Sequence, residues 1–241
     1  MLAVSEEGPI RGVVFDVDGT LVTLRASIGE LYSEALCELG VFLDGQRLER
    51  AVIAEWGAFE AEYLNTAELH ATQPSREVLV WCELVRRVLR QVDEGLSTRW
   101  DLIAGVYSFF ARGHSRRLVD GALEACKDLA AEGLVVVAAT NNDQRTPGVL
   151  AELGLAPHLS HILTAGDLLW KKPSPNFFGQ LSQRIGVPAA ELLHVGNSHV
   201  HDVEAAKKAG FQAVLFDPQR RGAEPRITTL AELAGLVMSR A

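Results

Sequence analysis

Five short apolar runs alternate with helical stretches along this chain of 241 residues, and the alternation leaves few folds open. Apolar runs of this length, bounded by polar residues or glycine, are typical of buried strands. Strands that alternate with helices predict an α/β fold with a parallel sheet and right-handed crossovers. The expected strands are residues 10–17, 134–140, 161–164, 192–195 and 213–216.

Helices are expected between these strands and after the last one. A glycine directly follows each of the four helices between and beside the later strands, in the position where glycine commonly closes a helix. A sheet connected in this way is doubly wound. The expected helices are residues 120–132, 147–153, 175–185 and 202–209, with a further short helix near 230–237.

Residues 24–113 break this rhythm, because they contain no convincing strand and are predicted to form several helices. Trp56, Phe59 and Tyr63 recur at i, i+3 and i+7, which marks one helical face and favours packing over substrate contact. We therefore expect an all-helical second domain, inserted after the first strand. The predicted division is a core of residues 1–23 and 114–241 with an inserted helical domain of residues 24–113.

Charge and hydrophobic content narrow the class of protein. Hydrophobic residues make up 48% of the chain, which is ordinary for a globular protein, and the net charge of -8 argues against nucleic acid as a partner. No apolar run approaches the roughly 20 residues that a membrane span needs. The first residues show no basic segment followed by an apolar one, so no signal peptide is expected and the predicted location is the cytoplasm. The three cysteines lack metal-binding or redox spacing and are expected to be reduced and mostly buried.

Polar side chains gather at the expected ends of the strands. In a doubly wound sheet, ligands bind beyond the carboxyl ends of the strands, so these residues are candidates for one shared site. The candidates are Asp16 and Asp18, Thr140 and Asn141, Lys172, and the segment from Asn197 to Asp202.

Asp16 and Asp18 lie two residues apart at the end of the first strand, so both carboxylates can point to the same side. Two carboxylates at close range raise the cost of ionising both, and one of them can hold a proton near neutral pH. One can then be a nucleophile, while the other gives and takes a proton. A hard divalent cation such as Mg²⁺ would neutralise the pair. Aspartates at this spacing are also typical of a simple turn with side-chain hydrogen bonds.

Three further motifs accompany this pair. The sequence Asp16-Val17-Asp18-Gly19-Thr20-Leu21 follows a buried strand, and the other motifs come after it in order. This constellation resembles the haloacid dehalogenase-like (HAD) hydrolase superfamily, and the resemblance covers the whole chain. It implies a Rossmann-like, doubly wound core, and it makes the helical block of residues 24–113 similar to the family's C1-type cap.

By that resemblance, Asp16 is the nucleophile that forms an aspartyl-phosphate, and Asp18 is the general acid and base. Asp18 protonates the leaving alkoxide and then activates the water that hydrolyses the intermediate. Its backbone carbonyl would ligate Mg²⁺. Because the family's dehalogenases lack the second aspartate, Asp18 favours a phosphoester over an organohalide as the substrate.

The second and third motifs supply the groups that are expected to bind phosphate. Thr140 occupies the position of the family's phosphate binder, and the neighbouring backbone amide at Asn141 assists it. Taken alone, this segment is also typical of a loop that caps the next helix. Lys172 stands directly before Pro173 in an arrangement that looks like the third motif, which marks it as the functional lysine. Lys171 is expected at the surface.

The fourth motif departs from the family's pattern. The segment from Gly196 to Asp202 resembles GDxxxxD, but Asn197 replaces the first acid, which is normally a direct Mg²⁺ ligand. Three outcomes stay open: a working site with a neutral amide ligand, compensation by His199 or Asp202, or a catalytically weak protein kept for binding. The implied metal ligands are Asp16, Asp18, Asp202 and the uncharged Asn197.

The resemblance implies a Mg²⁺-dependent hydrolase that cleaves a small phosphomonoester through an aspartyl-phosphate. The expected partner is a small phosphorylated metabolite, with neither nucleic acid nor membrane, and the chain is expected to be a monomer or homodimer. The alternatives are a weakly catalytic binding protein, a phosphomutase or a 2-haloacid dehalogenase. The helical block contains nine arginines, most of them expected on solvated faces. Arg25, which follows the first motif, is the candidate for binding a second anionic group of the substrate.

Overall fold

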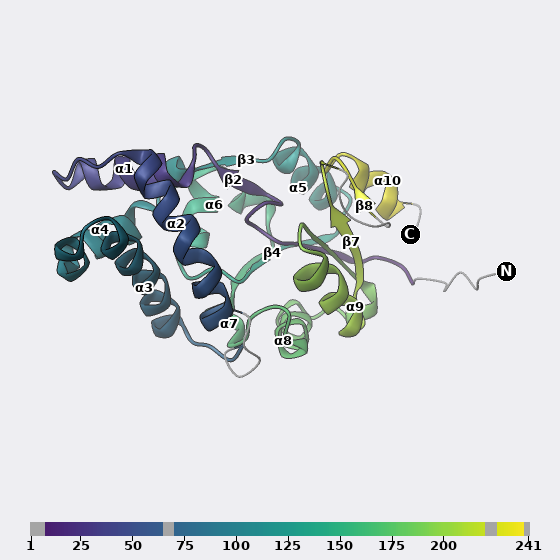
Figure 1. Ribbon diagram of the computed structural model, residues 1–241. Helices are drawn as coiled ribbons and strands as arrows, with labels where there is room; N and C mark the ends of the chain where they lie inside the picture. The colour runs from purple at the N-terminus through teal and green to yellow at the C-terminus, as the bar shows by residue number, and fades with distance from the viewer. Residues whose placement is uncertain (1–7, 65–69, 220–225, 239–241) are drawn as a thin grey trace.

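The computed structural model describes residues 8–64, 70–219 and 226–238 of the chain. Its centre is a six-stranded sheet in the order β5-β4-β1-β6-β7-β8, and every neighbouring pair is parallel (Figure 1). The first strand therefore lies in the middle, and the strand order reverses beside it, which is where a doubly wound sheet binds ligands. The strands are β1 Gly12–Phe15, β4 Val135–Thr140, β5 His161–Thr164, β6 Leu192–Gly196, β7 Gln212–Phe216 and β8 Arg226–Ile227.

Helices cover both faces of the sheet, because the side chains of each strand point alternately to its two sides. In β1, Val13 and Phe15 pack on one face with α5, α6 and α10, and Val14 packs on the other face with α7, α8 and α9. Each face therefore has its own hydrophobic core. The covering helices are α5 Ala122–Ala131, α6 Thr146–Glu152, α7 Ala165–Leu168, α8 Pro175–Ile185, α9 Ala205–Lys208 and α10 Glu232–Met238.

The five predicted strands are all present, and their ends differ from the prediction by at most two residues. The helix predicted at residues 202–209 is wrong in its first half, because His199–Glu204 forms a wider π-helical turn before α9 begins. Strands β2 Val22–Leu24, β3 Arg116–Leu118 and β8 lie outside the prediction, since two or three residues are too few to show alternation. Within the described ranges, no helix has both the length and the apolar composition that crossing a membrane requires.

A helical body, here called the cap, projects from one side of the sheet (Figure 1). Its helices pack around a hydrophobic core to which the six-stranded sheet contributes no side chain. Phe59 is fully buried there, and its ring centroid lies 5.9 Å from that of Trp56 and 5.2 Å from that of Tyr63, so the three rings pack together as predicted. Trp56 is nevertheless 37% exposed and also lines a cavity, which the prediction did not favour. Strands β2 and β3 pair antiparallel where the cap joins the core. The exact domain boundaries stay a prediction. The cap helices are α1 Ile28–Glu38, α2 Gly45–Phe59, α3 Pro74–Val92 and α4 Trp100–Phe109.

The cap also contacts the core beside the third motif. Ala71 forms an antiparallel bridge with Trp170, and the backbone N–H of Lys171 donates to the carbonyl of His70 over 2.7 Å. The Lys171 ammonium lies 2.9 Å from a carboxylate oxygen of Glu77 in α3, and both side chains are almost completely buried. The expected surface position of Lys171 is therefore wrong. Lys171 is only 1% exposed, because the segment that leads into α3 pairs with it and covers it.

The three cysteines are free, and their surroundings differ. Cys37 is exposed, whereas Cys82 and Cys126 are buried, and burial raises the pKa of Cys126 to about 12. Since the thiolate is the reactive form, we expect an aromatic disulfide reagent to modify Cys37 rapidly in the folded protein and the other two thiols only after denaturation. A thiol titration measures this directly. Rapid reaction of a second thiol in the folded state would contradict the arrangement.

Candidate active site

The first motif lies in a tight turn beyond the carboxyl end of β1. The backbone N–H of Val22 donates to the carbonyl of Val17 over 3.0 Å, which folds the chain back on itself. Gly19 lies in this turn with a φ of +84°, a left-handed conformation that favours glycine. A side chain at Gly19 would also collide with the side-chain amide of Asn197. The first and fourth motifs therefore meet at Gly19.

Lys172 joins the first, third and fourth motifs. Its Nζ lies 2.7 Å from Oδ1 of Asp16 and 2.6 Å from Oδ1 of Asp202, and all three side chains are buried. A buried charge is stable only when it is paired, so the lysine and the two carboxylates depend on one another. The structure thus brings three of the predicted site residues into direct contact.

Burial and charge separate the pKa values of these three groups. Burial raises the pKa of Asp16 to about 7, although Lys172 opposes the rise, and the charge of Asp202 adds to it. Burial would also raise the pKa of Asp202, but Lys172 and His194 outweigh burial and hold that pKa below its ordinary value. Burial disfavours the charged form of Lys172, but the two carboxylates outweigh it and keep the pKa of the ammonium above its ordinary value.

Asp202 is held by groups from three directions. Besides Lys172, Nε2 of His194 lies 3.1 Å from Oδ1, and the backbone N–H of Ser198 donates to Oδ2 over 2.9 Å. Burial lowers the pKa of His194, so we assign a neutral ring whose Nε2–H donates to the carboxylate. Gly196 leaves room for Asp202, since a side chain there would collide with the carboxylate. His194 is not among the predicted site residues, and its only sequence signal is a polar side chain within an apolar strand.

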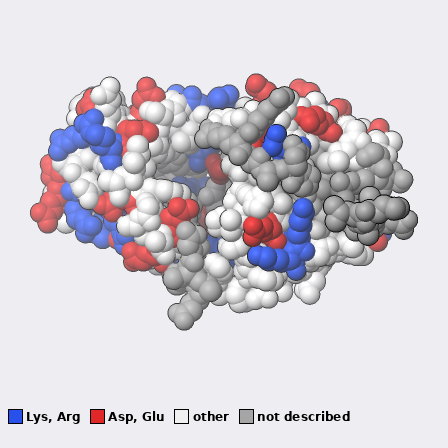
Figure 2. Space-filling model, turned by 45° about the vertical axis from the view of Figure 1, so that its right-hand side comes forward, with Lys and Arg blue, Asp and Glu red and all other residues white. Residues whose placement is uncertain are grey.

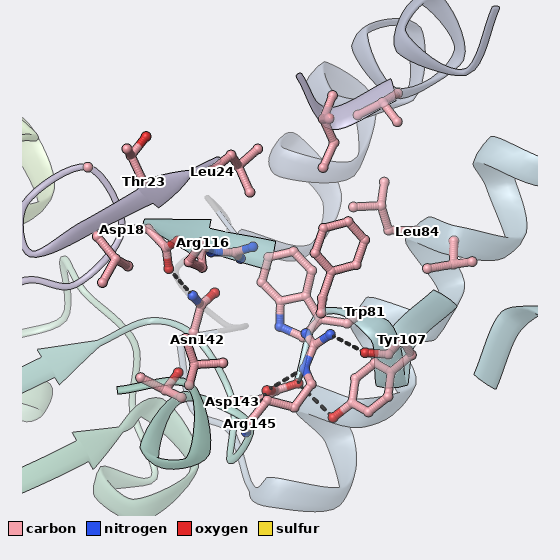
Figure 3. Close-up of a pocket in the computed structure, with 18 of the residues that line it drawn as sticks. Asp18, Thr23, Leu24, Trp81, Leu84, Tyr107, Arg116, Asn142, Asp143 and Arg145 are labelled. Carbon is pink, nitrogen blue, oxygen red and sulfur yellow. Dashed lines mark hydrogen bonds and ion pairs between the residues drawn. The ribbon is translucent and has the colours of Figure 1, made fainter. Parts of the chain in front are cut away.

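Asp18 has a different environment from Asp16. Its carboxylate accepts a hydrogen bond from Nε of Arg116 over 3.1 Å and another from the side-chain amide of Asn142. The side chain remains 40% exposed, and Figure 3 shows it pointing toward Arg116 and Asn142 at the edge of a cavity. Neither Arg116 nor Asn142 is a predicted site residue. The two aspartates of the first motif thus differ in burial, although they are only two residues apart.

Thr140 is the last residue of β4, and Asn141, which follows it, supports the lysine. The side chain of Asn141 accepts from the backbone N–H of Lys172 over 2.7 Å and donates to the Lys172 carbonyl over 2.9 Å. This reciprocal pair fixes the backbone from which the Lys172 side chain reaches the carboxylates. The hydroxyl oxygen of the buried Thr140 accepts from the backbone N–H of Asn142 over 3.1 Å, which leaves its proton for another acceptor. Phosphate binding by Thr140 and by the Asn141 amide stays a prediction.

The donor atoms around the first and fourth motifs suit a hard cation. Three carboxylates and one amide oxygen are available. Lys172 pairs with Asp16 and Asp202, and Arg116 pairs with Asp18, so two cations face three carboxylates. Mg²⁺ prefers oxygen ligands, takes only one or two carboxylates directly and keeps several waters, so the donors need not all meet at one point. The predicted ligands therefore fit Mg²⁺ by their chemistry. They are Asp16, which is buried, Asp18, which is half-buried, Asp202, which is buried, and Asn197, which is exposed.

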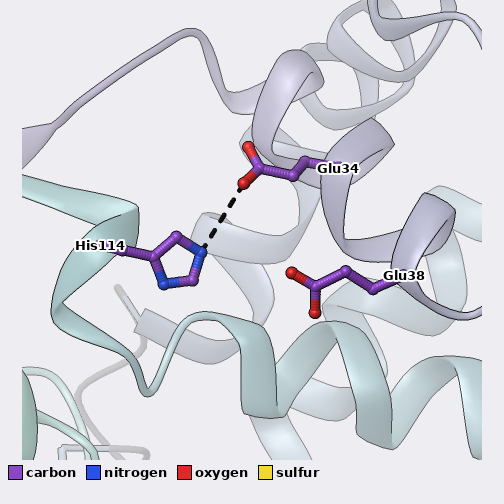
Figure 4. A group of neighbouring side chains, drawn as sticks. All are labelled: Glu34, Glu38 and His114. Atoms are coloured by element: carbon purple, nitrogen blue, oxygen red, sulfur yellow. Dashed lines mark ion pairs between the residues drawn. The ribbon is translucent and has the colours of Figure 1, made fainter.

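A second acidic group lies in the cap, away from these motifs. Glu34 and Glu38 of α1 approach His114, as Figure 4 shows, and one ligand atom from each lies within 4.8 Å of the others. Both carboxylates already have cationic partners, because Arg25 pairs with Glu34 and Arg112 lies 2.7 Å from Glu38. The group is therefore a network of surface ion pairs.

A cavity of about 460 Å³ lies between the cap and the core, beside the first motif. The space-filling view shows a hollow where the two bodies meet (Figure 2). Asp18, Asn142 and Asn197 line the cavity on its core side, and cap side chains such as Leu84 line much of the rest. In Figure 3, Asp18 and Asn142 lie on one side, and Leu84 and Tyr107 lie on the other. A cavity of this size suits a small-molecule ligand.

The family of the chain follows from its match to known sequences. A family profile described as haloacid dehalogenase-like hydrolase matches residues 10–210, which is most of the chain. The match defines the protein as a hydrolase. The chain belongs to the haloacid dehalogenase-like hydrolase family, in agreement with the four ordered motifs and the doubly wound sheet.

Individual relatives cover almost the same length. Haloacid dehalogenase-like hydrolase domain-containing protein 3 of Danio rerio is 29% identical over 214 residues, which span 87% of this chain and 86% of the relative. A phosphoglycolate phosphatase of Yersinia pseudotuberculosis is 29% identical over 210 residues, which span 83% of this chain and 78% of the relative. Among solved structures, a dehalogenase with an intermediate complex matches with a TM-score of 0.72 and 23% identity, over 95% of this chain and 98% of that one. This last likeness shows the fold alone.

Proposed function

We propose that the chain is a Mg²⁺-dependent phosphohydrolase that cleaves a small phosphomonoester through an aspartyl-phosphate on Asp16. The observation that carries the proposal is the difference between the two aspartates of the first motif. Asp16 is buried 2.7 Å from Lys172, whereas Asp18 lies at the cavity with 40% of its side chain exposed. A fixed carboxylate suits a nucleophile, and an accessible one suits proton transfer to and from a ligand. The phosphoglycolate phosphatase relative supports phosphate as the transferred group.

The two aspartates divide the reaction into two displacements at phosphorus. First, an oxygen of Asp16 attacks phosphorus, the bond from phosphorus to the ester oxygen breaks, and protonated Asp18 gives its proton to that oxygen. The products are a free alcohol, an aspartyl-phosphate and an ionised Asp18. Next, Asp18 takes a proton from water as the water oxygen attacks phosphorus and the acyl-phosphate bond breaks. Inorganic phosphate leaves, Asp16 is again a carboxylate, and Asp18 is again protonated.

Other groups of the chain would stabilise the charge that develops on the phosphoryl oxygens. The Lys172 ammonium lies beside the nucleophile and offsets negative charge there. The hydroxyl proton of Thr140 is available for a phosphoryl oxygen. Mg²⁺, when bound, supplies positive charge to the same oxygens. Its proposed ligands are Asp16, Asp18, Asn197 and Asp202.

The test compares the release of phosphate from p-nitrophenyl phosphate with the release of chloride from 2-chloropropionate, with Mg²⁺ and with a chelator. We expect phosphate release that requires Mg²⁺, and no chloride release. Chloride release would instead identify a dehalogenase, and chelator-resistant phosphate release would contradict the role of Mg²⁺. If neither product is released, the alternative of a weakly catalytic binding protein, which Asn197 suggests, would be favoured.

Restoring a carboxylate at Asn197 is expected to strengthen metal binding. The exchange Asn197→Asp adds one negative charge to the donor set, so we expect Mg²⁺ to bind about tenfold more tightly in a calorimetric titration. Gln180→Glu adds the same charge at an exposed position of α8 and is the matched control, for which no change is expected. Unchanged Mg²⁺ binding by Asn197→Asp would show that Asn197 is not at the metal, and weaker binding would show that the site requires the neutral amide.

A further inference from the structure

The cavity beside Asp18 is apolar where it extends into the cap. Two groups of polar side chains line it. Asp18, Asn142 and Asn197 lie near the first motif, and the members of a second group, Asp143, Arg145 and Tyr107, bind one another further along the wall. Toward the cap, the lining consists of aromatic and aliphatic side chains from α1, α2 and α3 and from the end of the cap. They include Tyr32, Trp56, Trp81, Leu84, Val85 and Phe110. A ligand whose reacting group lies at Asp18 would therefore place its remaining part among these rings and methyl groups.

The cavity has cations, but acidic neighbours already neutralise them. Among the described lining residues, the positive charges are those of Arg116 and Arg145. Nε of Arg116 lies 3.1 Å from Asp18, and Nε of Arg145 lies 2.9 Å from Asp143, which is itself buried. Both aspartates also line the cavity, so each of these cations already has an acidic partner beside it.

Arg145 is further fixed as part of the cavity wall. Its guanidinium donates to the backbone carbonyl of Tyr107 over 2.9 Å and lies 3.9 Å from the centroid of the Tyr107 ring. The Tyr107 hydroxyl in turn donates to Asp143 over 2.8 Å. Figure 3 shows these three side chains bound to one another below Trp81. The charge of Arg145 is therefore already balanced by the buried Asp143, and a ligand carboxylate beside it would add a second negative charge.

We propose that the substrate is a phosphomonoester whose alcohol portion is uncharged, apolar and large enough to reach the aromatic lining, such as an alkyl or arylalkyl phosphate. This inference rests on the proposed phosphatase activity and names its substrate class. The cavity of about 460 Å³ has room for a chain of several carbons. Its described lining residues offer no unpaired cation for a carboxylate at the far end of the ligand, so a small acidic ester such as phosphoglycolate does not match it.

The test uses two phosphonates that are not hydrolysed and differ only at the far end. Hexylphosphonate ends in a methyl group, whereas 6-phosphonohexanoate has the same number of carbons and ends in a carboxylate. In calorimetric titrations with Mg²⁺, we expect hexylphosphonate to bind about 100-fold more tightly, because its end gains apolar contacts and the carboxylate would lose water without gaining a partner. Equal binding, tighter binding of the carboxylate, or binding of neither compound would overturn the inference.

A pair of tryptophan exchanges locates the binding. Trp81 lines the cavity, whereas Trp100 is 59% exposed at the start of α4 and does not line it. We expect Trp81→Ala to weaken hexylphosphonate binding about tenfold and to reduce the preference over the carboxylate, since an aromatic contact is lost. Trp100→Ala is expected to change neither. If Trp81→Ala kept the full preference for hexylphosphonate over the carboxylate, the alkyl chain would not lie against Trp81. If Trp81→Ala folds poorly, the comparison of the two ligands in the unaltered protein still tests the substrate class.

Measuring both hydrolysis and phosphonate binding tells a wrong substrate class apart from a wrong phosphatase activity. If p-nitrophenyl phosphate is hydrolysed but the two phosphonates bind equally, the substrate class is wrong and the phosphatase proposal stands. If hexylphosphonate is preferred but no phosphomonoester is hydrolysed, the phosphatase proposal is wrong, and the cavity is a binding site for apolar phosphorylated ligands.

Discussion

Replacement of Asp16 by asparagine is expected to lower kcat for phosphomonoester hydrolysis by at least about 10⁴-fold, because an amide cannot form the aspartyl-phosphate. The shape of the side chain is conserved, and Lys172 keeps its contact with Asp202, so the protein is expected to remain folded. The rate of phosphate release and a thermal denaturation curve, measured on the same preparation, distinguish loss of chemistry from loss of structure.

The matched control for this exchange is Asp101→Asn, which removes an exposed carboxylate of the cap that pairs with Arg99. Its kcat is expected to equal that of the unaltered protein. If Asp16→Asn kept more than about a tenth of the original kcat, another group would have to be the nucleophile, and the assignment of Asp16 would be wrong.

Replacement of Glu77 by alanine is expected to reduce the free energy of unfolding by about 3–5 kcal/mol, the range seen when one partner of a buried ion pair is removed. Lys171 would remain as a buried ammonium, and the hydroxyl of Thr72 would also lose its acceptor. Denaturation by urea, followed by circular dichroism, measures the change. Because Glu77 belongs to the cap and Lys171 to the core, the effect tests whether this pair joins the two bodies.

Glu83→Ala is the matched control, since Glu83 lies in the same helix and pairs with Arg86 and Arg87 closer to the surface. Its expected cost is below about 1 kcal/mol, as for other partly solvated pairs. A double exchange of Glu77→Leu with Lys171→Met is expected to recover much of the stability, because no unpaired charge remains. A cost for Glu77→Ala no larger than that for Glu83→Ala would contradict the buried pair.

The sheet and the position of the site could be predicted because their signals are local in the sequence. Five of the six strands of the sheet are short, mainly apolar runs, and a buried parallel strand needs little else to be recognised. Asp16 and Thr140 stand at the ends of two such runs, and parallel strands bring their carboxyl ends to one edge. The order of the motifs then indicated which lysine reaches the aspartates, and Lys172 does contact Asp16.

The contacts that set the charge and burial of the site residues could not be predicted in the same way, because they join distant parts of the chain. Arg116 contacts Asp18 across 98 positions in the sequence, and no local sequence pattern predicts that pair. Lys171 has the same sequence neighbours whether it is solvated or buried, and its burial depends on Glu77 in the cap. His194 resembles any polar residue in a strand until the wide turn at residues 199–204 brings Asp202 against it.

The arginines that line the cavity could not be predicted from the sequence either. Arg25 is the sequence candidate for a second anionic group, but it pairs with Glu34 and donates to the carbonyl of His114, and it does not line the cavity. The arginines that do line it, Arg116 and Arg145, lie outside the helical block. Charge alone therefore did not indicate which arginines line the cavity or that acidic neighbours already pair with them, because both depend on contacts between distant segments.

Mass spectrometry of the enzyme stopped by acid during turnover would detect a phosphoryl group on Asp16 itself. With p-nitrophenyl phosphate and Mg²⁺, we expect the peptide containing Asp16 to gain the mass of one phosphoryl group. The gain is expected to be absent from Asp16→Asn and from enzyme stopped before substrate is added. A phosphoryl group on a different residue of the unaltered protein would show that Asp16 is not the nucleophile.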